Sequence, residues 1–486
     1  MNFKYCFILS MLMTTYSLQA QYFRELASTP FDGVIQSSVA FEDVDADGDL
    51  DLLITGRNND EEGISKLYLN DGEGNFSVQQ NTTLEGVQFS ATAFSDVDGD
   101  GDKDLLLTGH GTEPIAKLYL NDGTGVFTEK SNTPFDGVGS SAVSFGDVDR
   151  DGDEDLLLTG STKNERIAKL YKNEGMGTFV EVKGTPFTGV ASSATAFADV
   201  DGDNDLDVLI TGRDANLQSS TKLFLNDGNG GFSEKTGTAI TNLHYSTVVF
   251  SDVNGDDAPD LIISGTSSSN GMNQPISEIY LNDAAGNFTL LSGLPFEGHF
   301  YGSVACSDID GDGDQDLIVT GGINESHAKL YLNNGNAIFS EAQNEALTGV
   351  WYSSIAFADV DGDEAQDVLI TGSVDFNGKQ LTAKLYRNVG LVNSVGSTAS
   401  DLSIDYSLFP NPTAAEFVNV RFVSLSPEEV SLQVYNSEGI LVRRQATRTT
   451  TGTQTIKLDV SHLARGIYFV ELLVQGQSRT AELIIR

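Results

Sequence analysis

Seven short acidic loops recur along this chain, each with oxygen-bearing side chains at positions 1, 3, 5 and 9. The first runs from Asp43 to Asp51, and later copies begin at Asp96, Asp147, Asp199, Asp252, Asp308 and Asp359, a period of about 52 residues. Side chains at positions 1, 3, 5 and 9 of such a loop can converge on one point, where position 7 adds its carbonyl oxygen. Hard oxygen donors in this number suit Ca²⁺ better than Mg²⁺, which prefers to keep its waters. The spacing therefore predicts a calcium site in each loop.

The predicted ligands follow from this register. Five loops carry aspartate at all five odd positions: Asp43, Asp45, Asp47, Asp49 and Asp51; Asp96, Asp98, Asp100, Asp102 and Asp104; Asp147, Asp149, Asp151, Asp153 and Asp155; Asp199, Asp201, Asp203, Asp205 and Asp207; Asp308, Asp310, Asp312, Asp314 and Asp316. Loops five and seven offer Asp252, Asn254, Asp256 and Asp260, and Asp359, Asp361, Asp363 and Asp367.

The loops differ in the residue at position 6, where the chain turns sharply. Four loops have glycine there, and loop four has Asn204, which tolerates the left-handed region. Loops five and seven have Asp257 and Glu364, so we expect weaker or partial calcium occupancy in these two. A helix-flanked calcium loop is excluded, because its bidentate glutamate at position 12 is replaced by strand residues such as Ile54.

Solvated turns are the alternative interpretation of these loops, because aspartate is a common turn residue. Electrostatics opposes it. Two carboxylates about 4 Å apart repel by roughly 4 kcal/mol at an effective dielectric constant near 20. Four gathered carboxylates would therefore open the loop unless a cation joined them.

The elements around each loop are short strands. In the first copy a small-residue strand over 37–41 precedes the loop, an apolar strand over 52–55 follows it, and strands over 66–69 and around Phe76 flank an Asn-Asp-Gly turn. Four such strands make one antiparallel blade, and seven blades lie within the usual range of β-propellers. The last copy stops at Asn388 without its fourth strand, which the segment 22–26 matches. We therefore predict an all-β, seven-bladed β-propeller of four-stranded blades, closed by its own N-terminal segment.

Residues 21–392 resemble the FG-GAP (VCBS-type) repeats of integrin α-subunit heads and many bacterial surface proteins. The resemblance rests on seven copies of one acidic loop with a strand on each side. It implies a calcium-binding propeller.

The remainder of the chain differs in composition. A Ser/Gly/Thr-rich linker is predicted over 393–404, followed by a small immunoglobulin-like β-sandwich over 405–486. Its 409–412 Phe-Pro-Asn-Pro opening, the 436–439 turn and the 463–469 segment resemble the type A sorting domain of the type IX (Por) secretion system. The resemblance implies export across the outer membrane through contact with the secretion machinery. An ordinary spacer or carbohydrate-binding module is the alternative.

Targeting and charge agree with an extracellular protein. Residues 1–20 have the pattern of an export signal, with Lys4, an apolar stretch and Ala20, and no segment is long enough to span a bilayer. We expect a secreted or outer-surface location. The net charge of −42 lies almost wholly in the repeats, because residues 401–486 hold nine acids and eight bases. This charge argues against a nucleic acid partner. Without its signal the protein keeps one cysteine, Cys306, which aligns with core phenylalanines of other copies.

Partner binding is predicted at the loops that enter the first strands. There the last three copies carry an aromatic cluster, His244, Tyr245, Phe300, Tyr301, Trp351 and Tyr352, where copies three and four have only small residues. Clustered aromatic residues are typical of surfaces that bind glycans or proteins, although they could equally plug a channel mouth. We expect a binding or adhesion module without catalysis. A polysaccharide-active lyase or hydrolase is the alternative, but His110, His244, His299 and His327 stand without a nucleophile or base at motif spacing.

Overall fold

The computed structural model describes residues 21–269, 272–343, 345–392, 406–409, 413, 417–424, 429–436, 441–449, 452–461, 463–474 and 477–486. The predicted export signal (1–20) and linker (393–404) lie outside the described residues. Every regular element in the described part is a strand. No helix there is long and apolar enough to cross a membrane. The chain divides into two compact units, residues 1–394 and 395–486.

The first unit contains seven four-stranded antiparallel sheets, called blades one to seven. Their strands, from the innermost outward, are β2 (Ile35–Glu42), β3 (Asp51–Arg57), β4 (Gly63–Leu69) and β5 (Ser77–Val78); β6 (Gln88–Ser95), β7 (Asp104–His110), β8 (Pro114–Asn121) and β9 (Phe127–Glu129); β10 (Gly139–Gly146), β11 (Asp155–Ser161), β12 (Arg166–Asn173) and β13 (Phe179–Glu181); β14 (Ala191–Ala198), β15 (Asp207–Arg213), β16 (Ser219–Leu225) and β17 (Ser233–Glu234); β18 (His244–Ser251), β19 (Asp260–Ser269), β20 (Met272–Asn282) and β21 (Phe288–Leu290); β22 (Val304–Ser307), β23 (Asp316–Gly322), β24 (Ser326–Leu332) and β25 (Ser340–Glu341); β26 (Trp351–Ala358), β27 (Asp367–Ser373), β28 (Leu381–Val392) and β1 (Gln21–Glu25).

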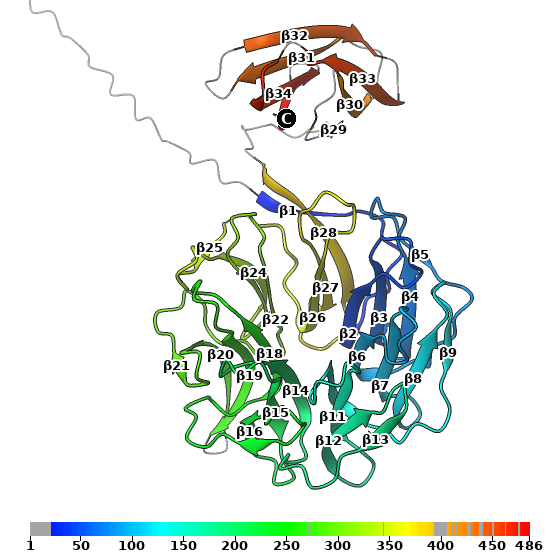
Figure 1. Ribbon diagram of the computed structural model, residues 1–486, viewed down its shortest axis with the longest axis vertical. Coiled ribbons are helices and arrows are strands. Elements are labelled where there is room, and N and C mark those ends of the chain that lie inside the picture. The colour runs from blue at the N-terminus through cyan, green and yellow to red at the C-terminus, as the bar shows by residue number, and fades with distance from the viewer. Residues whose placement is uncertain are drawn as a thin grey trace, which may run out of the picture. The chain divides into compact units, whose positions relative to one another are not determined.

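The blades form a closed, propeller-like ring (Figure 1). The first strand of each blade contacts the first strand of the next, and β26 contacts β2 to complete the circle. Second strands such as Leu52-Leu53-Ile54 are buried along their whole length between neighbouring blades. Their apolar runs explain this position, because a strand covered on both faces needs no polar alternation.

Hydroxyl pairs join the second strand of one blade to the first strand of the next blade at six of the seven seams. In each pair the threonine of a second strand meets a serine of the following first strand, as in Thr55 Oγ1 to Ser90 Oγ at 2.8 Å and Thr371 Oγ1 to Ser37 Oγ at 2.9 Å. The other four pairs are Thr108–Ser141, Thr159–Ser193, Thr211–Ser246 and Thr320–Ser353. Blade six lacks the serine, because Gly302 stands there.

The N-terminal segment closes the ring as the sequence predicts. Strand β1 pairs antiparallel with β28, with Phe23 opposite Asn388 and Glu25 opposite Tyr386. Phe23 is fully buried among Ile309, Ile318 and other core residues. The carboxylate of Glu345 accepts hydrogen bonds from the amides of Tyr22 and Phe23, at 2.7 and 3.0 Å. The two ends of the unit are therefore joined in one sheet.

The second unit consists of two antiparallel sheets that share one core. One contains β29 (Tyr406–Phe409), β30 (Phe417–Ser424) and β33 (Gly452–Asp459), and the other contains β31 (Glu429–Asn436), β32 (Leu441–Arg448), β34 (Gly466–Val474) and β35 (Gln477–Ile485). Val420 and Phe422 from the first sheet pack with Leu432, Val470 and Leu472 from the second. Alternation of buried and exposed residues along β34 matches a sheet with one covered face.

Ring closure by β1 gives the first prediction. Phe23→Ala removes a fully buried ring and should lower the free energy of unfolding by about 3–5 kcal/mol. Urea denaturation of the purified protein measures it. Glu25→Ala in the same strand is the matched control, because its ion pair with Lys384 is on the surface and should contribute less than about 1 kcal/mol. Equal stability of the two variants would contradict closure through β1.

Candidate functional site

Each acidic loop connects the first strand of a blade to the second, and all seven share one backbone conformation. Position 6 has φ near +94° in Gly48, and Asp257 and Glu364 take the same left-handed region at +66° and +71°. Position 1 caps the turn: Asp43 Oδ2 accepts the amide of Gly48 at 3.0 Å, and Asp359 Oδ2 accepts that of Glu364 at 2.8 Å. The residues at position 6 of loops five and seven therefore do not change the turn, although a non-glycine residue there carries some backbone strain.

Carboxylates gather in these loops, although each cluster holds three of the four predicted positions. Ligand-type oxygens from positions 1, 3 and 9 lie within 4.8 Å of one another in loops one, two, three and six. In loop four the converging set is Asp199, Asp201 and Asp203. Loop five is different, because Asn254 Nδ2 donates to Asp256 Oδ2 at 3.0 Å and so satisfies one carboxylate internally.

Several carboxylate oxygens of these clustered residues are buried without a hydrogen-bond partner among the described residues. They include Asp43 Oδ1, Asp45 Oδ1, Asp98 Oδ1, Asp149 Oδ1 and Asp201 Oδ1. A buried carboxylate oxygen without a partner is costly unless a cation or a donor meets it. The donor set is all oxygen, which fits Ca²⁺. These residues could hold the ion, and Asp47, Asp100, Asp151 and Asp312 at position 5 belong to the same loops.

The aspartate at position 9 is the most deeply buried member of each loop, with at most 1% of its surface exposed in all seven copies. Both of its oxygens are engaged: Asp51 Oδ2 accepts the amide of Val44 at 3.1 Å, and Oδ1 accepts the amide of Asn70 at 2.8 Å. The other six copies repeat both contacts.

Burial controls the protonation of these groups. It raises the pKa of Asp51, Asp155 and Asp367 to about 7, although the amide hydrogen bonds oppose the shift. The same cause raises the pKa of Asp104, Asp207, Asp260 and Asp316 to about 6. Burial and neighbouring carboxylates also raise the pKa of Asp45, Asp98, Asp201 and Asp310 at position 3.

An asparagine that the sequence analysis assigned only to a turn links each site to the next blade. In blade two, the side-chain Nδ2 of Asn121 donates to the carbonyl of Val44, in the acidic loop of blade one, at 2.8 Å. The backbone N–H of Asn121 donates to Asp104 Oδ1 in the acidic loop of its own blade. Asn70 makes the equivalent contact to Val360 at 2.9 Å, which crosses the closing seam. The remaining five are Asn173, Asn226, Asn282, Asn333 and Asn388. Recurrence of asparagine in all seven turns was the available signal.

The sequence predicts that position 7 contributes its backbone carbonyl to the calcium site. The side chain at this position points to the turn between the third and fourth strands of the blade. A side chain on Gly72 would fall 2.4 Å from Asp49 Oδ2, so Asp49 lies directly against the turn of its own blade. Asp102, Asp205 and Asp314 lie in the same way against Gly123, Gly228 and Gly335. Where position 7 is Ala258, the turn has Ala284 in place of glycine. In loops one, two, four and six the side chain at position 7 therefore lies against the turn of its own blade.

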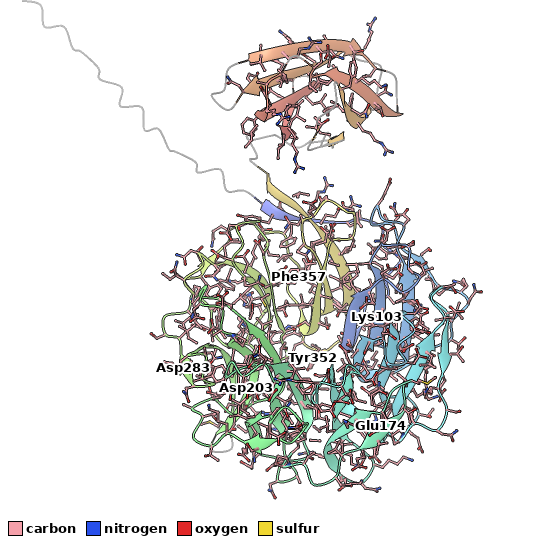
Figure 2. All side chains as sticks on the ribbon, viewed as in Figure 1. Lys103, Glu174, Asp203, Asp283, Tyr352 and Phe357 are labelled. Carbon is pink, nitrogen blue, oxygen red and sulfur yellow. The ribbon has the colours of Figure 1, made fainter. Side chains whose placement is uncertain are left out.

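The predicted aromatic cluster gathers at the other end of the innermost strands. Figure 2 shows Tyr352 close to the centre of the ring, whereas Asp283 and Glu174, in turns between outer strands, lie near its edge. The rings of Tyr301 and Tyr352 are 4.5 Å apart between centroids, and Tyr245 lies 5.7 Å from Tyr301. All three residues have left-handed backbone angles, with φ between +46° and +54°.

Exposure divides this cluster into two layers. Tyr245 is exposed, and Phe300, Tyr301 and Tyr352 are half-buried. Trp351 and His244 are buried at 3% and 0% exposure. His244 Nδ1 lies 2.9 Å from Ser219 Oγ, and burial, with the nearby charge of Arg213, lowers the pKa of His244 to about 4. These two buried residues pack against other rings of the cluster, His244 against Tyr245 and Trp351 against Phe376. Because they are buried, they would not touch a partner directly.

One member of the cluster was missed by the sequence analysis. Phe376, from the loop between β27 and β28, is 55% exposed and lies edge-on to Trp351 at 5.2 Å and 6.2 Å from Tyr301. It lies in the variable loop of the repeat, so the periodicity of the sequence does not indicate that it belongs to the cluster.

Two histidines that stand apart in the sequence meet in blade six, where the rings of His299 and His327 are 5.6 Å apart. His327 lines a cavity of ≈ 250 Å³ together with Lys329, Glu341 and Glu345. Glu341 is paired with Lys329 at 3.0 Å, and Glu345 holds the N-terminal strand. Both carboxylates of this cavity are therefore engaged in structural contacts.

Comparison with known families finds two matches. The family of FG-GAP-like repeats matches residues 43–107, 96–158, 199–263, 252–319 and 308–370, and the family described as secretion system C-terminal sorting domain matches residues 407–486. The sequence matches no curated protein.

Three of the solved structures that match have low sequence identity and low TM-scores. AofleA from Arthrobotrys oligospora is 10% identical, covering 64% of this chain and 86% of its own, with a TM-score of 0.38. A mutant of Aleuria aurantia lectin, solved with alpha-methyl-L-fucoside, is 9% identical over 64% and 96%, with a TM-score of 0.39. Dimeric latent PorU from Porphyromonas gingivalis is 14% identical over 74% and 35%, with a TM-score of 0.17. At these scores the likenesses support no inference about fold or ligand.

The buried aspartates predict an inverted pH dependence in metal-free protein. These carboxyl groups have a pKa of about 6 to 7 in the folded protein, above the ordinary value of 3.8. Between pH 3.8 and this raised pKa, the folded state therefore binds more protons than the unfolded state. Stability contributed by these groups is therefore present at low pH and lost as pH rises through 6 to 7. Thermal unfolding in excess chelator should show a higher melting temperature at pH 5 than at pH 7.5.

Calcium should reverse this trend, because protons compete with the ion for the same oxygens. In excess calcium the stabilisation over the chelated protein should shrink as pH falls from 7.5 to 5. A metal-free protein that becomes steadily more stable between pH 5 and 7.5 would contradict the assignment.

Proposed function

Because the chain belongs to the FG-GAP-like repeat family and carries a secretion system C-terminal sorting domain, we propose that it is a calcium-stabilised binding or adhesion module that acts outside the cell. The sorting domain directs export by the type IX system to a secreted or outer-surface location. In this proposal residues 21–392 form a seven-bladed propeller, residues 1–20 are a removed signal, and residues 405–486 form an immunoglobulin-like sandwich that contacts the secretion machinery.

The departure of blades five to seven from the repeat is the observation that carries the binding proposal. Tyr245, Tyr301 and Tyr352 occupy a position that is Ser140 and Ser192 in blades three and four, with the same left-handed backbone. The fold therefore does not need aromatic rings at this position.

Blade six departs further. Its first strand, β22, has four residues, whereas the first strands of the other blades have eight. Gly302 stands where the other first strands have serine, and Ser264 of blade five forms its hydroxyl contact with Ser277 of its own blade. A side chain at Gly302 would lie 2.0 Å from the carbonyl of Thr320, so the chain approaches its neighbour too closely for the usual serine. The regular ring is thus altered where the aromatic side chains gather.

A glycan is the partner that we favour. Aromatic faces offer apolar area together with phenolic hydroxyls, and Gln36, Ser140 and Ser192 add polar groups at the same repeat position. A sugar presents the complementary combination of apolar C–H faces and hydroxyl edges. An extracellular protein is the other outcome that the binding experiment separates.

Calcium would have a structural part in this function. Each innermost strand begins at the aromatic end and leads into an acidic loop, and eight residues span roughly 25 Å at about 3.3 Å per residue. Ions in the loops would therefore lie far from a partner at the aromatic end. They would hold the blades in place without bridging to the ligand.

Calcium dependence is tested by metal analysis and melting. The exported protein should contain calcium in stoichiometric amounts, and chelator should lower its melting temperature, because binding to the folded state alone stabilises by mass action. Added Ca²⁺ should restore the melting temperature better than Mg²⁺. An unchanged melt, or purified protein without calcium, would refute the proposal.

Partner binding is tested with a glycan array and Tyr301→Ala. We expect loss of binding at least tenfold in affinity, since a central aromatic anchor of an interface contributes about 2 kcal/mol or more. Phe89→Ala is the matched control, because it changes the same repeat position in blade two. Trp351→Ala is a poorer probe, because removing a buried ring destabilises the fold.

If Tyr301→Ala and Phe89→Ala bind an identified glycan equally well, the aromatic cluster is not the site. Binding to extracellular proteins but to no glycan would favour the other partner class. Product formation on a polysaccharide panel would replace the binding module with an enzyme.

A further inference from the structure

The third strands of blades three and seven carry a cation where the other five blades carry leucine. The residue before the conserved asparagine is Leu69, Leu120, Leu225, Leu281 or Leu332 in those five blades. It is Lys172 in blade three and Arg387 in blade seven. The blade fold does not require a charge at this position, because five blades of the same ring have leucine there.

Both cationic groups reach the acidic loop of their own blade. Lys172 Nζ forms ion pairs with Asp149 and with Asp151, the latter at 3.3 Å. Arg387 Nη1 lies 2.8 Å from Asp361 Oδ2. Two of the three contacted side chains are largely sheltered, with 11% of Asp149 and 15% of Asp361 exposed, whereas Asp151 is 38% exposed.

These contacts fall on predicted calcium ligands. Asp149 and Asp361 occupy position 3, and Asp151 occupies position 5. Asp149 belongs to the cluster with Asp147 and Asp155, whose oxygens lie within 4.8 Å of one another. A lysine or arginine at this distance lowers the mutual repulsion of the carboxylates and also repels an incoming divalent cation.

We propose that Lys172 and Arg387 are tethered counter-cations that replace part of the calcium in loops three and seven. These two loops then stay closed without the ion and bind it more weakly than loops one, two, four and six. The inference rests on the proposed calcium function and adds a distinction among its sites. It also changes the expectation for loop three, whose five aspartates and glycine predicted full occupancy.

The position of Arg387 gives this arrangement a structural use. Strand β28 pairs with the N-terminal strand, and Arg387 Nη2 also donates to the carbonyl of Glu73 in the outer turn of blade one. One side chain thus joins the acidic loop of blade seven to blade one across the closing seam. The seam would be held before calcium is available.

The test compares calcium binding in the full-length exported protein and in variants that restore or introduce the pattern of other blades. Lys172→Leu installs the residue found in five blades, and Leu120→Lys transfers the lysine of blade three to blade two. Lys183→Leu is the charge-matched control, because Lys183 is 76% exposed and its ion pair among the described residues is with Glu181, outside the acidic loops. Calcium titration calorimetry, metal analysis at fixed free calcium and melting in chelator are measured for each.

We expect Lys172→Leu to tighten one calcium site about tenfold or more and to increase the fall in melting temperature caused by chelator. Leu120→Lys should lose one calcium at limiting free calcium and become less sensitive to chelator. Lys183→Leu should match the unmodified protein. Because the two loop variants change calcium binding in opposite directions, a general loss of stability cannot imitate the result.

The outcomes separate this inference from the function on which it rests. If the unmodified protein binds calcium but neither loop variant changes the isotherm relative to Lys183→Leu, the tethered-cation inference is wrong and the calcium proposal stands. If no form of the protein binds calcium, both are wrong.

Discussion

The ring depends on a buried aspartate at the end of each acidic loop. Its two oxygens bind the amide of the loop residue at position 2 and the amide of the asparagine that ends the third strand, as Asp51 does with Val44 and Asn70. That asparagine donates in turn to the acidic loop of the preceding blade. A charge-assisted hydrogen bond in such a place contributes roughly 1.5–3 kcal/mol, and losing a partner leaves a buried group unsatisfied. The repeated contact joins blade to blade around the whole circle.

This arrangement would favour a bound cation in the loops, as proposed above. Burial makes ionisation of the position 9 carboxyl costly, and neighbouring carboxylates have buried oxygens without a hydrogen-bond partner in the described part of the chain. A divalent ion would offset both costs at once, and it would also fix the loop to which the next asparagine binds. Calcium at one end of the innermost strands would therefore stabilise contacts between blades as well as its own loop.

The two ends of the innermost strands are built differently. The acidic end is nearly identical in all seven blades, because each must make the same contact with its neighbour. The opposite end repeats its left-handed backbone but varies its side chains, from Ser192 in blade four to Tyr352 in blade seven. A fold that is held at one end leaves residues at the other end free to change. The aromatic cluster lies at this variable end, in three neighbouring blades.

The sequence by itself determined the strands, their fourfold grouping, the acidic loops and the pairing of the N-terminal segment with the last blade, because all of these are written as local patterns at a constant period. It also indicated the sorting domain through short motifs. Only the tertiary structure decided which side chains meet across blades. Asn70 reaches Val360 and Phe376 covers Trp351 through contacts between segments that no periodic pattern connects. Burial of His244 and Trp351, and the approach of Lys172 and Arg387 to the acidic loops, likewise depend on how neighbouring strands pack, since a residue's environment in a closed ring is set by chain segments that are distant in sequence.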